Sequence, residues 1–82
     1  MSTPFSSRRG GVKFKVSERN IVRLPKIGRA SEYVRILGIT TMTMWYWYKR
    51  YGLPVIRSQD AVLIDRNVFR TWLKKTGRYK PA

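Results

Sequence analysis

The side chains best suited to chemistry in this chain are aromatic and basic, and they occur together in one short segment. The segment from Thr40 to Pro54, TTMTMWYWYKRYGLP, contains five aromatic residues together with Lys49 and Arg50. Lysine and arginine neutralise phosphates, while tyrosine O–H and tryptophan N–H groups donate hydrogen bonds to phosphates or base edges. These residue types in this arrangement are typical of a surface that binds nucleic acid.

The charge of the whole chain favours the same kind of partner. Its 82 residues include 18 Lys and Arg but only 4 Asp and Glu, which gives a formal net charge of +14. Such an excess of positive charge repels itself unless a polyanion neutralises it. A chain of this length has room for one small domain with one core. We therefore expect a single domain with a nucleic acid as its partner.

Several kinds of site are excluded by residues that the chain lacks. It has no Cys and no His, so disulfide bridges, Cys/His zinc sites and imidazole-based catalysis are ruled out. Its carboxylates are few and scattered, at Glu18, Glu32, Asp60 and Asp65. No segment approaches the roughly 20 apolar residues that a membrane-spanning helix needs. We therefore expect a cytoplasmic protein that is not an enzyme and has no cofactor, metal or membrane partner.

A first helix is predicted directly before the aromatic segment. Apolar residues recur after Pro25 at the spacing of one helix face, at Ile27, Ala30, Val34 and Leu37. This pattern predicts a helix over residues 27–37. Gly38 then ends the helix, because glycine readily adopts the left-handed conformation at a helix C-terminus. A second helix follows almost at once, which indicates a helix-turn-helix.

The second helix is predicted to begin at Thr40 or Thr41, since either hydroxyl can cap free N–H groups, and to end before Gly52. At 100° per residue, one helix face holds the residues that we expect in the core: Met44, Trp47, Tyr48 and Tyr51. The opposite face holds Met42, Trp45, Tyr46 and Lys49, with Thr41 and Arg50 at its margins. One thin domain cannot cover both faces, so we expect Trp45 and Tyr46 to be exposed. The alternatives are that Trp45 packs on the N-terminal arm or that Tyr46 lies in a dimer contact.

The remaining pattern predicts a hairpin and a closing helix. β-Branched runs flank the polar tetrapeptide at residues 58–61, which is typical of two short strands joined by a turn. Asp65 can cap a last helix that ends near Gly77. Its apolar stripe is formed by Val68, Phe69, Trp72 and Leu73.

The ends of the chain are expected to lie outside the domain. Residues 1–20 are predicted to be a basic flexible arm, residues 21–76 the folded domain, and residues 77–82 a basic tail. The alternation of apolar residues and lysine in VKFKV, residues 12–16, leaves open whether this stretch forms a short edge strand.

Residues 29–74 resemble the small winged helix-turn-helix domains of the MerR superfamily, in particular the phage excisionases. The matching positions are Leu37, Gly38, Ile39, Thr40, Thr43, Met44, Trp47, Gly52, Leu53, Pro54, Arg57, Ile64, Phe69, Trp72 and Leu73. The resemblance implies an α+β fold, a small winged helix-turn-helix with a short β-hairpin wing and a closing C-terminal helix. It also implies that the second helix enters the major groove of double-stranded DNA, while the wing lies along the minor groove or the backbone.

Carried over by position, the resemblance implies a set of DNA-binding residues: Thr41, Met42, Thr43, Trp45, Tyr46, Lys49 and Arg50, with Arg57 at the base of the wing. The wing tip differs from many members of the family, because it lacks Gly and basic residues and contains Asp60. Arg8 and Arg9 in the N-terminal arm could supply the missing phosphate contacts, or they could only aid solubility.

The function implied by the resemblance is that of an excisionase, or recombination directionality factor. Such a protein binds and bends attachment-site DNA to direct a phage integrase in a bacterial host, and it can associate with further copies on adjacent sites. One alternative is a small phage transcriptional regulator that represses or activates. Another is an RNA-binding or ribosome-associated protein, in which Trp45 and Tyr46 would stack on single-stranded bases.

Overall fold

Four helices and two small sheets make up residues 14–81, the part of the chain that the computed structural model describes. In chain order the elements are β1 (Val16–Ser17), α2 (Glu18–Ile21), β2 (Ile27–Arg29), α3 (Ala30–Leu37), α4 (Thr41–Lys49), β3 (Ile56–Arg57), β4 (Val62–Asp65), α5 (Arg66–Lys75) and β5 (Tyr79–Lys80). The α+β class expected from the sequence is therefore correct. None of the helices in this range has the length and apolar character that crossing a membrane would require.

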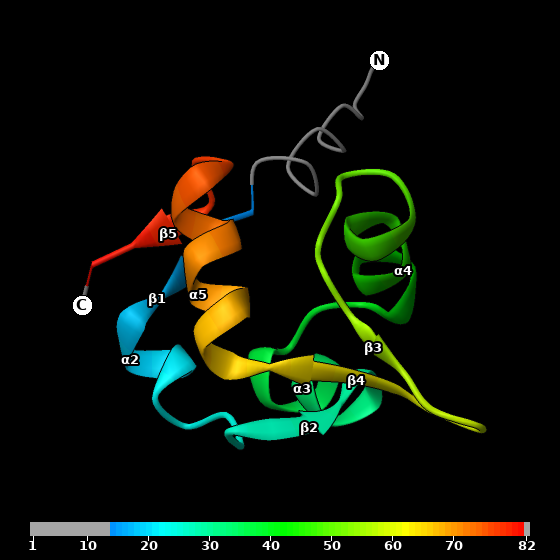
Figure 1. The fold of residues 1–82 in the computed structure, drawn as a ribbon. Coiled ribbons are helices and arrows are strands. Elements are labelled where there is room, and N and C mark those ends of the chain that lie inside the picture. Colours follow the sequence, from blue (N-terminus) through cyan, green and yellow to red (C-terminus); the bar gives the residue numbers. More distant parts are fainter. Residues whose placement is uncertain (1–13, 82) are drawn as a thin grey trace, which may run out of the picture.

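The larger sheet is antiparallel, with the strand order β2-β4-β3, and it runs along the lower edge of Figure 1. Strands β3 and β4 form the hairpin predicted around residues 58–61, whose tip projects away from the rest of the molecule. The Ser58 N–H donates to the Ala61 carbonyl at 2.9 Å and so closes the turn.

The third strand of this sheet corrects the prediction of a helix over residues 27–37. Residues 27–29 are strand β2, in which Ile27 pairs with Asp65 and is 52 % exposed. The physical reason is the pairing of these three residues with β4, in which Gly28 is opposite Ile64 and Arg29 opposite Leu63. Gly28 also packs so closely on Pro25 that a Cβ there would come within 2.4 Å of the proline ring. Helix α3 begins only at Ala30, after the Arg29 N–H donates to Glu32 Oε1 at 3.1 Å.

The smaller sheet joins the two ends of the described chain. Strand β1 pairs in parallel with β5, and the two lie side by side at the left of Figure 1. Val16 is buried, and so is Arg78 just before β5. The expected boundaries of the arm, residues 1–20, and of the tail, residues 77–82, are therefore wrong, because residues 16–20 and 78–80 belong to the fold. Within the stretch 12–16, Phe14 and Lys15 are not in a strand and Val16 starts β1, while residues 12 and 13 lie outside the described residues.

The core is built around Trp47 on α4. Its ring lies 5.4 Å from that of Trp72, 6.0 Å from that of Phe69 and 6.4 Å from that of Phe14, measured between centroids. Helix α5 supplies two of these rings, and its first turn is capped by Asp65, whose Oδ1 accepts from the N–H groups of Asn67 and Val68 as predicted.

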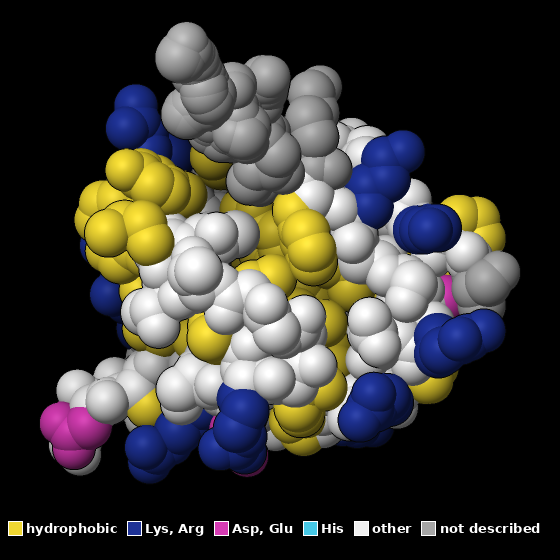
Figure 2. All heavy atoms as spheres, turned by 180° about the vertical axis from the view of Figure 1, so that it is seen from behind, with side chains coloured by type: hydrophobic (Ala, Val, Ile, Leu, Met, Phe, Trp, Pro, Cys, Tyr) yellow, Lys and Arg dark blue, Asp and Glu magenta, His cyan; other side chains and the backbone are white. Residues whose placement is uncertain are grey.

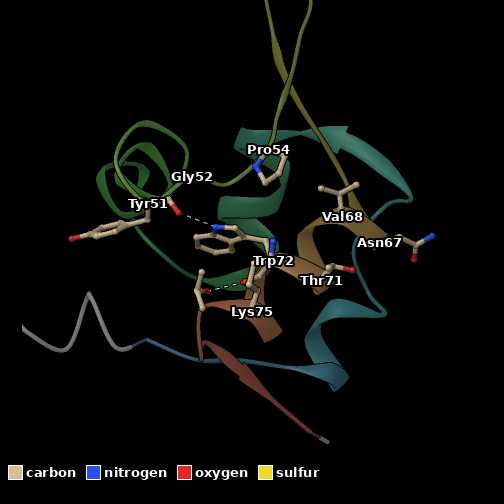
Figure 3. Close-up of a pocket in the computed structure, with 9 residues that line it drawn as sticks. Tyr51, Gly52, Pro54, Asn67, Val68, Thr71, Trp72 and Lys75 are labelled. Carbon is tan, nitrogen blue, oxygen red and sulfur yellow. Dashed lines mark hydrogen bonds between the residues drawn. The ribbon is translucent and has the colours of Figure 1, made fainter.

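Val68 departs from the predicted stripe of α5, because it is 39 % exposed while the rest of the stripe is buried. It lies in the first turn of α5, at the rim of a hollow of about 400 Å³ that opens between α5 and the segment around Gly52 and Pro54 (Figure 3). The Trp72 indole N–H donates to the Tyr51 carbonyl at 3.0 Å in this hollow. That bond ties the chain directly after α4 to the closing helix.

Arg78 adds a second tie between the same two parts of the molecule. Its guanidinium carbon lies 5.0 Å from the centre of the Tyr51 ring and 5.3 Å from that of the Trp72 ring. A guanidinium over an aromatic face is attracted by the ring quadrupole, and burial strengthens that attraction. The C-terminal end of α4 is therefore fixed against α5 and the segment that follows it.

Trp47→Ala is expected to lower the free energy of unfolding by about 3–5 kcal/mol, because it removes the ring at the centre of the core. The matched control is Trp45→Ala, which removes the same side chain from a position that is 42 % exposed. Thermal melts of the two variants measure the difference. Equal loss of stability in both would contradict the observed rotation of α4.

One ion pair links α2, at the N-terminal end of the fold, to α5. Glu18 Oε2 accepts from Arg70 at 2.8 Å, and Glu18 Oε1 accepts from Arg70 Nε at 2.9 Å and from the Tyr79 hydroxyl at 2.9 Å. The hydrogen bond from Arg70, supported by the one from Tyr79, holds the pKa of Glu18 below its ordinary value of 4.5, against an opposing effect of desolvation. The charged carboxylate is therefore the form that the fold favours.

This pKa shift predicts an acid dependence of stability. Because the folded-state pKa is lowered, the contribution of Glu18 is complete above its unfolded-state pKa and is lost as the pH falls through the folded-state value. Glu18→Gln should lower the melting temperature at pH 7, and the gap between variant and parent should narrow as the pH drops below about 5. Asp60→Asn, at the exposed hairpin tip, serves as the control. A gap that stays constant down to pH 3 would show that the carboxylate charge contributes nothing.

Candidate nucleic-acid interface

Both ends of α4 are defined by features that the sequence predicted. Gly38 adopts the left-handed conformation, with φ of 72°, and ends α3. Thr40 is the N-cap of α4, where its Oγ1 accepts from the Thr43 N–H at 3.0 Å. Gly52, with φ of 79°, turns the chain after the helix. These caps set the length of α4, and the core sets its rotation.

The face of α4 that points away from the core is formed mainly by apolar side chains. Met42 is 59 % exposed, Trp45 42 % and Tyr46 37 %, whereas Met44 and Trp47 are 1 % exposed. Hydrophobic side chains gather over the part of the surface that holds α4, at the upper left of Figure 2, with Lys and Arg side chains at their border. The predicted split between a core face and an exposed face is confirmed for these residues.

A shallow hollow of about 450 Å³ lies on this face, lined by Thr41, Met42, Trp45 and Tyr46. The Trp45 and Tyr46 rings meet edge to face, with centroids 5.4 Å apart and an interplanar angle of 74°. Thr43 is only half-exposed, and its hydroxyl lies 2.9 Å from that of Thr40, so it is engaged within the cap. The walls of the hollow are therefore largely apolar.

Positive charge follows in the last turn of the same helix. Lys49 and Arg50 are both exposed, and the Arg50 guanidinium lies 5.7 Å from the centre of the Tyr46 ring. A cation near the C-terminus of a helix interacts favourably with the partial negative charge there. Aromatic and cationic groups thus meet on one surface, as the sequence predicted.

The remaining predicted residues lie elsewhere. Arg57 is exposed on β3, at the base of the hairpin tip, and does not belong to the face of α4. The tip itself contributes Asp60 and no basic side chain. Arg8 and Arg9 lie outside the described residues.

Tyr51 is placed differently from the prediction, which put it in the core. It is 41 % exposed, because α4 ends at Lys49 and helical periodicity no longer positions a residue beyond that point. Its ring contacts the guanidinium of Arg78, a residue that no local sequence pattern marks as part of the fold. Gly52, the next residue, is the signal that could have placed Tyr51 outside the helix, since a glycine at this point marks the end of a helix.

The side chains exposed on α4 are mainly apolar, aromatic and cationic. Across residues 14–81, no three His, Cys, Asp or Glu side chains gather where they could hold a metal ion. No protein-family model matches the chain, and neither does any curated protein or solved structure.

Proposed function

We propose that this protein binds double-stranded DNA as a winged helix-turn-helix, with α4 as the recognition helix. The observation that carries the proposal is the exposed face of α4, where Met42, Trp45 and Tyr46 lie beside Lys49 and Arg50. Large apolar side chains seldom stay exposed together without a partner, and cations beside them fit a polyanion.

The arrangement of the elements supports this proposal. Helices α3 and α4 are joined by a short turn at Gly38, as in a helix-turn-helix, and the β3–β4 hairpin follows as a wing. With α4 in the major groove, Lys49 and Arg50 would neutralise phosphates at its C-terminal end. Arg57 would do the same at the base of the wing. The hairpin tip, with Asp60, is poorly suited to phosphate binding.

The resemblance to phage excisionases extends the proposal to a specific role. In that role the protein would act by occupying DNA, bending it, or recruiting an integrase. A single small module buries about 600–1,000 Å² on DNA, which is modest for selecting one site in a genome. Copies bound side by side on adjacent sites would add both contacts and curvature, at a bending cost of about 1–6 kcal/mol.

Lys49→Ala and Arg50→Ala are expected to weaken binding to duplex DNA and to leave the melting temperature nearly unchanged. Each lost phosphate contact should flatten the plot of log affinity against log salt concentration by about 0.9. Lys80→Ala is the charge-matched control, because Lys80 lies on β5, on the other side of the molecule from α4 (Figure 1). Fluorescence anisotropy over a range of salt concentrations gives both quantities. Equal effects of the three substitutions would show binding by net charge alone, and tighter binding to single-stranded RNA would favour the RNA-binding alternative.

The excisionase role is tested on the attachment site of the element that encodes the protein. A gel-shift titration should give stepwise complexes, and a circularly permuted probe should reveal bending. Adding the protein to the integrase of the same element should raise the yield of excision. A single unbent complex with no gain in excision would remove the excisionase role and leave a simple transcriptional regulator as the better proposal.

A further inference from the structure

The exposed face of α4 is short of the side chains that read bases by paired hydrogen bonds. Arg or Lys recognises guanine in the major groove, and Asn or Gln recognises adenine, each with two hydrogen bonds. None of these residue types occurs among residues 41–46, and the cations of the helix, Lys49 and Arg50, come only in its last turn. The first two turns of α4 must therefore contact DNA in some way other than paired hydrogen bonds to base edges.

Apolar surface is what these turns offer instead. The hollow of about 450 Å³ is lined by Thr41, Met42, Trp45 and Tyr46, and Met42 is the most exposed of its large apolar side chains. The Thr43 hydroxyl, which could have donated to a base, lies 2.9 Å from Thr40 Oγ1 inside the helix cap. The hollow thus combines a largely apolar lining with a volume large enough to hold a small apolar group.

The edge of a base pair in the major groove offers one apolar group, the C5-methyl of thymine. Contact with that methyl group needs no hydrogen-bond partner, only an apolar surface from which water is displaced. Positive charge near the hollow is also suited to DNA, since the Arg50 guanidinium lies 5.7 Å from the centre of the Tyr46 ring that lines the hollow, and Lys49 is exposed in the last turn of α4. Phosphates on either side of the groove would meet these cations.

We infer that the hollow on α4 binds the C5-methyl groups of thymine, and that Met42 is the residue that makes the protein prefer thymine-rich duplexes. This inference rests on the proposed function, because it requires α4 to lie in the major groove. It adds a specificity that the proposed function does not contain. It also gives a chemical reason for choosing DNA over RNA, because uracil lacks the methyl group.

The experiment uses duplexes that differ only at the C5 position. The full-length protein is titrated with alternating A·T duplexes that contain thymine, and with the same duplexes in which uracil replaces thymine. Affinity should fall about fourfold for each methyl group that the hollow covers, which is the contribution of burying one group of this size. Alternating G·C duplexes with cytosine or 5-methylcytosine form a second pair, in which the methylated form should bind more tightly.

Two variants separate contact with the methyl group from effects of DNA shape. Met42→Ala should bring the affinities of the thymine and uracil duplexes together, because the apolar wall of the hollow is lost. Lys49→Ala should weaken binding to both duplexes by the same factor and keep their ratio. Both side chains are exposed, so melting temperatures near that of the parent confirm that each variant is folded.

The outcomes distinguish this inference from the proposed function. Equal, salt-dependent binding to thymine and uracil duplexes would overturn the inference and leave DNA binding intact. A preference for thymine that persists unchanged in Met42→Ala would also overturn it, because the discrimination would then come from DNA shape. No measurable affinity for any duplex would overturn the proposed function and the inference together.

Discussion

The burial of Trp47 is the constraint on which the rest of the structure depends. Helix α4 carries bulky side chains all around, so its sequence alone offers two faces that could enter the core. The rings of Phe14, Phe69 and Trp72 surround Trp47 and decide between them. Once this face is buried, no helix or strand within residues 14–81 covers Met42 and Trp45, which stay exposed. The surface that we propose to bind DNA is thus a consequence of how the core is packed.

A fold this small depends on its ends as well as on its core. Arg78 is buried between the rings of Tyr51 and Trp72, and its Nε has no hydrogen-bond partner among the described residues. Contact with two aromatic faces offsets part of the cost of desolvating that charge. Because Arg78 is held in this way, its charge is directed into the fold and is not available at the surface of α4. The net charge of the chain is therefore larger than the positive charge that can face a polyanion.

Local chemistry made part of this fold predictable from the sequence. Gly38 and the caps at Thr40 and Asp65 act on the residues next to them, so their effect can be read from a few positions. The exposed face of α4 followed from the helical repeat, since Met42, Trp45 and Tyr46 all lie within the helix.

Contacts between distant segments account for what the sequence did not predict. The spacing of Ile27 fits a helix, but its pairing with Asp65 in strand β2 depends on a strand that comes much later in the chain. Val16 pairs with Tyr79, a residue even further along the chain, and no local sequence pattern predicts that pairing. Tyr51 was misplaced for a different reason, because the helical repeat was extended past the residue at which the helix ends.

The parallel pairing of β1 and β5 has a mechanical consequence. The chain enters the fold through β1 and leaves it through β5, and the two strands run in the same direction. A force that pulls the ends of the domain apart would slide these strands past each other, so that it loads their hydrogen bonds together in shear instead of opening them one at a time. Tension along the chain would therefore be resisted by this two-residue pair, at the opposite side of the molecule from α4 (Figure 1), and by the contact of Phe14 with Trp47.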